Sequence, residues 1–150
     1  MITVTGTYTS YGTAASIVAL VAAAAREGCE AWADLVLVTA QSIVPVRSGR
    51  LRDSGHLDID TDSSGVVVDV VFDSDHAMFV EFGTGILGKG TYPGELPTEG
   101  VPITGHWEYD YKHQNWVGMP AQPYLRPAFD EYRDQAETVV REAVMSAIGV

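Results

Sequence analysis

The sequence is poor in the residues that usually mark a secreted, membrane-spanning or disulfide-bonded protein. Its single cysteine, Cys29, excludes an intrachain disulfide, and we expect a buried structural thiol there. The longest apolar run, residues 14–25, is only about twelve residues long, whereas a membrane-spanning helix needs roughly 20. The N-terminus lacks the positively charged segment of a signal peptide. We therefore expect synthesis in the cytoplasm and no membrane partner.

Positive charge is also scarce. The chain has 9 Lys and Arg against 20 Asp and Glu, which gives a formal net charge of −11. An acidic surface repels phosphate groups, so the composition argues against a nucleic-acid-binding module. The same charge suits a protein past which DNA slides without sticking, and it also suits a soluble acidic domain with another role.

The residues that are present predict one α+β domain spanning 1–150. Hydrophobic residues make up 46% of the 150, enough for a packed core. Residues 1–12 form a polar N-terminal arm or a short strand. A long helix is predicted over 13–43, because its apolar residues recur at three- and four-residue steps and Pro45 follows.

An antiparallel β-meander is predicted to follow the long helix. Alternation over 56–60 and a β-branched run over 66–72 predict a hairpin, and 76–82 forms a third strand or a short helix that turns into one. Residues 83–105, rich in Gly and Pro, form a long extended loop. A C-terminal helix over 127–147 is expected to pack on the sheet.

No pattern in the chain has the full context of a catalytic or cofactor site. Residues 83–88 fit the spacing of a dinucleotide-binding glycine motif, but 89–94 contain Gly and Pro and cannot open the helix that such a motif needs. His76 and Glu81 resemble an acid–base pair, yet five residues along a strand place them on opposite faces. We therefore expect no catalytic residues and no cofactor.

One group of residues has the chemistry of metal ligands. It comprises His106, Glu108, Asp110 and His113. Their spacing matches no standard zinc pattern, and strand alternation places most of them on one polar face. A solvated face is the preferred interpretation. A small metal- or ligand-binding enzyme that uses these residues, or His76 and Glu81, stays as the alternative from a different class.

Two clusters are candidates for contacts between proteins. Arg47, Arg50 and Arg52 form either a solvated turn that balances nearby acids or a contact between subunits, and phosphate binding is the weaker reading. A second cluster is aromatic and consists of Trp107, Tyr109, Tyr111 and Trp116. Interface anchoring is preferred there over core packing, and base stacking would need a positive groove.

Three short stretches then follow one another, each at the edge of a predicted element. They are Pro45-Val46-Arg47-Ser48-Gly49-Arg50-Leu51-Arg52-Asp53-Ser54, Val80-Glu81-Phe82-Gly83-Thr84 and Met119-Pro120-Ala121-Gln122-Pro123-Tyr124-Leu125-Arg126-Pro127-Ala128-Phe129. In this order they resemble the neck proteins of long-tailed double-stranded DNA phages, also known as head–tail joining, tail completion or head–tail connector proteins. Arg47 and Ser48 depart from the acidic residue and the Thr that are usual in the first motif, and His76 stands where an aromatic is common.

The resemblance implies a non-enzymatic structural protein in the neck of the virion, between the head and the tail. Its copies would form a homo-oligomeric ring, a hexamer by that resemblance, which contacts other connector and tail proteins. Double-stranded DNA would pass through the lumen without specific binding. A tail terminator ring that caps the tail tube is the alternative within the same class.

The motifs also suggest roles for single residues. Gly49 and Gly83 stand where tight turns need an unhindered backbone. Glu81 is expected to pair with Arg126 or Arg50 and so to pin the last helix to the sheet. The structural and interface candidates are Arg47, Gly49, Arg50, Arg52, Glu81, Phe82, Gly83, Trp107, Tyr109, Trp116, Pro123, Tyr124, Arg126 and Pro127.

Overall fold

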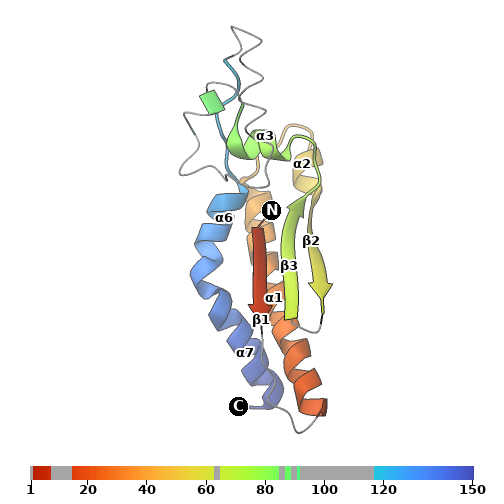
Figure 1. The fold of residues 1–150 in the computed structure, drawn as a ribbon. Coiled ribbons are helices and arrows are strands. Elements are labelled where there is room, and N and C mark those ends of the chain that lie inside the picture. Colours follow the sequence, from red (N-terminus) through yellow and green to blue (C-terminus); the bar gives the residue numbers. More distant parts are fainter. Residues whose placement is uncertain (1, 8–14, 63–64, 85–86, 89–90, 92–116) are drawn as a thin grey trace.

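The computed structural model describes residues 2–7, 15–62, 65–84, 87–88, 91 and 117–150, and Figure 1 shows how its elements are arranged. In chain order these are β1 (Ile2–Thr7), α1 (Ala15–Ile43), α2 (Arg50–Asp53), β2 (Gly55–Thr61), β3 (Gly65–Phe72), α3 (Ala77–Phe82), α6 (Leu125–Tyr132), η2 (Arg133–Gln135) and α7 (Ala136–Ile148). The predicted α+β class, with a long N-terminal helix, an antiparallel sheet and a C-terminal helix, is confirmed. The C-terminal helix packs mainly on α1, however, and not on the sheet as predicted.

Helix α1 packs against both the sheet and the C-terminal helices. One side contacts the sheet and another contacts α6 and α7 (Figure 1). Its Trp32, Val36 and Ala40 are buried in the core. The last helical hydrogen bond runs from the N–H of Val44 to the carbonyl of Ala40 at 2.9 Å, and Pro45, which has no N–H, follows. Among the described residues, no helix is long and apolar enough to cross a membrane.

The sheet has the strand order β1-β3-β2, and both pairings are antiparallel. The predicted hairpin is β2–β3, with Ile59 opposite Val68. Val66, Val68 and Val70 of the central strand face α1 and are buried. Residues 2–7 form a strand, which was one of the two alternatives for the N-terminal arm.

Residues 77–82 form helix α3, which does not turn into a strand of the sheet as the second alternative for that segment expected, and the reason lies in the pairing of β3. A third strand of a meander would need the free edge of β3. That edge is occupied by β1, which pairs with β3 from Ile2 opposite Val70 to Thr7 opposite Gly65. The chain after Phe72 therefore leaves the sheet and turns across its end (Figure 1).

The C-terminal helix is interrupted, which the sequence did not predict. The 3₁₀ turn η2 separates α6 from α7. At the break, the indole Nε1–H of Trp32 donates a 2.7 Å hydrogen bond to the carbonyl oxygen of Tyr132. The Trp32 side chain is only 1% exposed. Its buried donor is thus satisfied by a carbonyl at the end of α6.

Helices α1 and α7 approach closely at Gly28. A Cβ atom added to Gly28 would lie 2.8 Å from the Cα of Val140 and 3.2 Å from the Cβ of Ala143. The nearest atom belongs to a backbone, so it cannot swing aside. The glycine in the middle of α1 is therefore explained by helix packing, which outweighs its poor helix propensity of about 1 kcal/mol relative to Ala.

We predict that Gly28→Ala lowers the free energy of unfolding by about 1–3 kcal/mol, because α7 must move away from α1. Chemical denaturation followed by circular dichroism measures the change. Glu27→Ala, at the exposed neighbouring position of the same helix, is the control and should stay within about 0.5 kcal/mol of the wild type. A stabilised Gly28→Ala variant would show that helix propensity dominates at this position.

Candidate functional site

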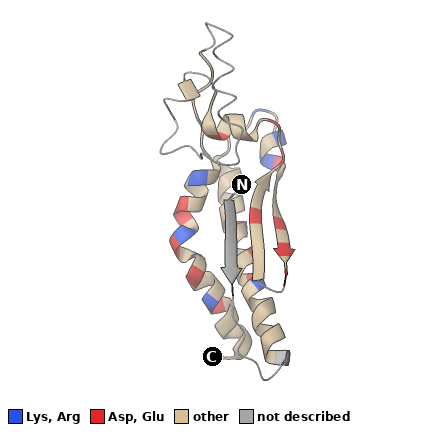
Figure 2. Cartoon of the chain, viewed as in Figure 1, with Lys and Arg blue, Asp and Glu red and all other residues tan. Residues whose placement is uncertain are grey.

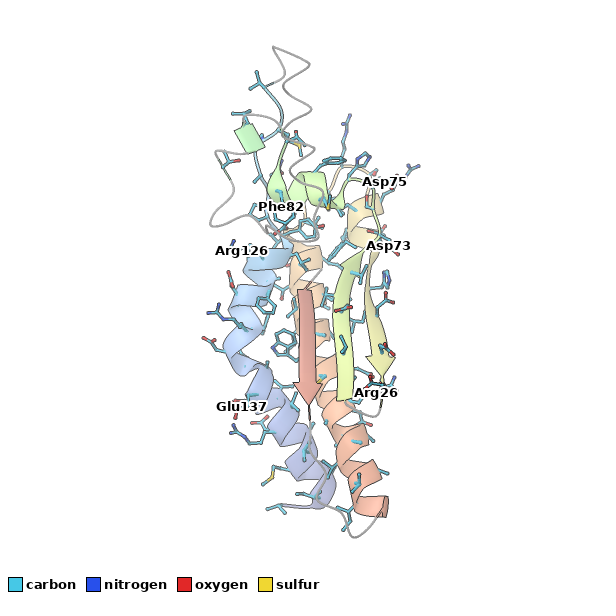
Figure 3. The ribbon with its side chains drawn as sticks, in the orientation of Figure 1. Arg26, Asp73, Asp75, Phe82, Arg126 and Glu137 are labelled. Atoms are coloured by element: carbon cyan, nitrogen blue, oxygen red, sulfur yellow. The ribbon has the colours of Figure 1, made fainter. Side chains whose placement is uncertain are left out.

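The second and third sequence motifs lie side by side at one end of the molecule. Thr84 and Met119 form a β-bridge, with N–H to carbonyl distances of 2.8 Å and 3.0 Å in the two directions. The N–H of Gln122 donates to the carbonyl of Val80 at 2.8 Å. We call residues 77–84 together with 119–126 the motif junction. Figure 3 shows Phe82 and Arg126 at this end of the ribbon.

Glu81 is the centre of the motif junction. Its side chain is buried, with 6% of the residue exposed. Oε2 accepts hydrogen bonds from the backbone N–H groups of Tyr124 at 2.8 Å and Leu125 at 3.0 Å. Oε1 accepts a third from the N–H of Arg126 at 3.2 Å.

These three N–H groups belong to the first turn of α6, where the helix itself offers them no acceptor. The N-cap residue, Tyr124, makes no side-chain cap hydrogen bond. A carboxylate from another part of the chain takes that place. Its negative charge also interacts favourably with the positive end of the helix dipole.

Glu81 therefore ties the last helix to α3, whereas the sequence predicts an ion pair with Arg126 or Arg50 that pins this helix to the sheet. The bonds run to backbone N–H groups, and the contribution of Arg126 is its main chain. The Arg126 guanidinium Nε lies 3.7 Å from a carboxylate oxygen of Asp130, one turn further along α6. The expected carboxylate–guanidinium brace is thus replaced by a helix cap.

Tyr124 anchors the junction in the core. It is 2% exposed, and its ring makes an edge-on contact with Phe72 of β3 at a centroid distance of 4.9 Å. Its hydroxyl donates to the carbonyl of Ala77 at 3.5 Å. Burial, and secondarily the nearby Glu81 carboxylate, raise the pKa of the Tyr124 phenol far above its usual range.

The backbone around Tyr124 is shaped by two prolines and a glycine. Pro123 precedes it, and Pro127 lies in the first turn of α6, where a missing N–H costs nothing. Gly83 has a φ of 74°, and a Cβ there would lie 2.5 Å from the Cα of Gly88. Only glycine fits this close crossing of two chain segments. Phe82, beside it, is partly buried.

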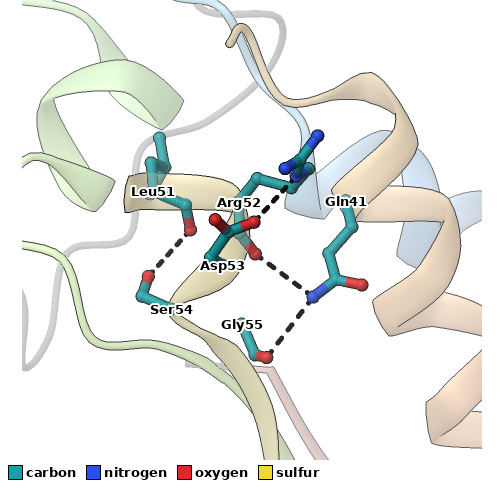
Figure 4. A network of polar contacts seen from close by, with 6 residues as sticks. All are labelled: Gln41, Leu51, Arg52, Asp53, Ser54 and Gly55. Carbon is teal, nitrogen blue, oxygen red and sulfur yellow. Dashed lines mark hydrogen bonds and ion pairs between the residues drawn. The ribbon is translucent and has the colours of Figure 1, made fainter. Parts of the chain in front are cut away.

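The first motif, which contains α2, lies at one end of the sheet. Figure 4 shows how Gln41 of α1 holds it: the amide Nε2 donates to the carbonyls of Arg52 at 3.2 Å and Gly55 at 3.4 Å. Gly49, with a φ of 83°, precedes α2. Leu51 packs against the core, whereas Arg47, Arg50 and Arg52 are exposed. The motif therefore turns its arginines outwards.

The remaining candidates divide into two groups. His76 is the exposed residue before α3, and both carboxylate oxygens of its suggested partner Glu81 accept backbone hydrogen bonds. Within the described residues, no three His, Cys, Asp or Glu side chains are grouped to hold a metal ion. Trp107, Tyr109 and Trp116 lie outside the described residues, as do Tyr111, the His106–His113 ligand set and residues 85–86 of the glycine motif.

Cys29 is buried, as predicted. Burial and the neighbouring Glu30 raise the pKa of its thiol. Sequence reasoning missed Gln41 and the hydrogen bond of Trp32, because their partners are backbone carbonyls far along the chain. A glutamine near the end of a helix and a tryptophan on its apolar face give no sign of such partners.

Comparison with known families gives one finding. Residues 14–83 match the model of the family described as "Bacteriophage HK97-gp10, putative tail-component". The chain is similar to phage tail components. The match covers just under half of the 150 residues and contains the first motif and all of the second except Thr84. It supports a phage tail or neck-region family and a structural, non-enzymatic role in the virion. No curated protein and no solved structure matches the chain.

We predict that Glu81→Gln lowers the free energy of unfolding by about 2–3 kcal/mol. The amide loses the charge and turns an NH₂ group towards at least one of three N–H donors. Urea denaturation measures the change. Glu131→Gln, on the exposed side of α6, makes the same chemical change and should shift the value by no more than about 0.5 kcal/mol. Equal effects of the two substitutions would contradict the capping role.

Proposed function

We propose that this protein is the neck subunit of a tailed phage, forming a ring that joins the DNA-filled head to the tail and passes DNA through its lumen. The observation that carries the proposal is the family match over residues 14–83 together with the third motif, which the structure joins to the second through Glu81. The matched half and the unmatched C-terminal half thus make one structural unit.

The arrangement of the chain supports a role in assembly. The long helix α1 spans most of the length of the molecule. The motif junction and the turn that bears Arg47, Arg50 and Arg52 lie towards the same end (Figure 1). The segment between Thr84 and Met119 starts and finishes at this end, because these two residues are bridged. We propose that this segment, which includes most of the 83–105 loop, contacts a neighbouring connector or tail protein.

The charge of the chain supports passage of DNA without specific binding. The net charge is −11, and Figure 2 shows acidic residues on both described strands of the hairpin and along the C-terminal helices. Every arginine of the C-terminal helices stands beside an acid, such as Arg133 next to Asp134 and Arg141 paired with Glu137. Such a surface repels phosphates and would keep DNA mobile in the lumen.

A tail terminator ring is the second candidate, because the matching family is described as a tail component. Both proteins would form rings on the axis of the particle. They differ in what happens when the protein is missing: a neck protein leaves complete heads and tails unjoined, whereas a terminator leaves tail growth unchecked.

We predict that deleting this gene from its phage gives DNA-filled heads beside free tails of normal length, as counted by electron microscopy of lysates. Supplying the wild-type gene from a plasmid should restore joined particles and is the control. Overlong tails would favour the terminator instead. Intact infectious virions would overturn both assignments.

A further inference from the structure

Two cations in the described part of this acidic chain have no ion-pair partner. Within the described part of the chain, every arginine except Arg47 and Arg50 forms an ion pair with an Asp or Glu close to it in sequence. The pairs are Arg26–Glu30, Arg52–Asp53, Arg126–Asp130, Arg133 with Asp130 and Asp134, and Arg141–Glu137. Arg47 and Arg50 are exposed on the turn that leads from α1 into α2. Their guanidinium groups are available to another molecule.

The sheet carries the opposite charge on the face turned away from α1. We call this the outer sheet face and define it by His56, Asp58 and Asp60 of β2 with Val67, Asp69 and Val71 of β3. These residues alternate with the core-facing valines of β3 and their partners on β2. No described helix packs on this side of the sheet in Figure 1.

The centre of the outer sheet face has more carboxylate acceptors than donors, and the nearest donor is the His56 ring, whose Nε2 lies 3.7 Å from Oδ1 of Asp58. Asp58 and Asp69 stand directly opposite each other in the register of β2 and β3. Like charges in this position repel and weaken the strand pair. Oδ1 of Asp69 is buried and has no hydrogen-bond partner, alone among the buried side-chain nitrogen and oxygen atoms of the described residues. A buried unpaired carboxylate oxygen is costly, so positive charge placed beside this carboxylate would stabilise it.

Arginine has the shape to meet this need. Its planar guanidinium can donate to two carboxylates at once, which suits the facing pair Asp58 and Asp69. Its aliphatic stem can cover the partly exposed Val67 and Val71 on either side of Asp69. Lysine would supply charge without the fork, and DNA would be repelled by the same carboxylates.

We propose that the turn bearing Arg47 and Arg50 of one subunit docks on the outer sheet face of a second copy of this chain. The two surfaces belong to the same chain but are different, so the contact is head-to-tail, and such a contact builds a ring when its rotation closes. It also neutralises charge locally between copies that otherwise repel each other. This inference rests on the proposed ring-forming function and names the contact that builds the ring.

The test uses charge reversal in phage lacking this gene, with each variant supplied from a plasmid. Arg47→Glu with Arg50→Glu makes both surfaces acidic. Asp58→Arg with Asp60→Arg makes both basic, using exposed positions of the edge strand β2. We expect each double variant to lower the titre of infectious particles by roughly 30-fold or more. The variant with all four changes has complementary surfaces again and should recover most of the titre. Co-expression of the two double variants should also recover it.

Two controls keep the result interpretable. Arg133→Glu with Arg141→Glu makes the same change in net charge on the C-terminal helices and should affect the titre less than the Arg47 and Arg50 changes. Circular dichroism melting of each purified variant separates loss of folding from loss of contact. A folded four-change variant that stays as defective as its parents overturns the proposal, because the arginines then contact a different protein. Double variants with wild-type titres also overturn it.

Phage that carry the empty plasmid distinguish failure of the proposed interface from failure of the proposed joining role. Suppose that phage with the empty plasmid have a low titre, and that the wild-type gene restores the titre while the four-change variant does not. The interface is then wrong and the joining role stands. If phage with the empty plasmid are fully infectious, the joining role fails and the interface that rests on it fails too.

Discussion

The structure depends on one carboxylate placed at the start of a helix. Glu81 is far from α6 in sequence, yet its two oxygens satisfy three N–H groups that the helix cannot satisfy itself. Because these donors are on the main chain, the cap requires no particular side chains at positions 124–126. It fixes where α6 begins and in which direction it leaves. The positions of Tyr124 in the core and of α7 along α1 follow from that start.

The second constraint is the closeness of the long helices. Gly28 allows the backbones of α1 and α7 to approach, and the Trp32 indole bonds to the carbonyl that ends α6. One contact requires the absence of a side chain, and the other requires a large side chain with one polar atom. Together they fix how far apart the helices lie and where the C-terminal helix is interrupted.

The elements with strong local patterns were predictable from the sequence. The three- and four-residue periodicity before Pro45 located α1 to within two residues at its start, and alternation located the β2–β3 hairpin. The local pattern did not decide between strand and helix for α3, and it did not predict the break at η2. Both features depend on partners that are distant in the sequence. Whether 77–82 forms a strand depends on β1 already occupying the edge of β3, and the break in the C-terminal helix coincides with a bond from Trp32. The motif indicates that Glu81 holds the last helix through an arginine, but only the folded structure shows that its partners are backbone N–H groups.

The β-bridge between Thr84 and Met119 holds together the two points at which the chain leaves the described framework and rejoins it. The buried core residues of the described part of the chain all lie outside the stretch between these two residues. Lengthening a loop whose ends are fixed costs little closure entropy, about 0.6 kcal/mol for each doubling. A lineage can thus vary this stretch to suit a changing neighbour while the helices and sheet stay constant, and an engineer can graft a foreign sequence there for the same reason.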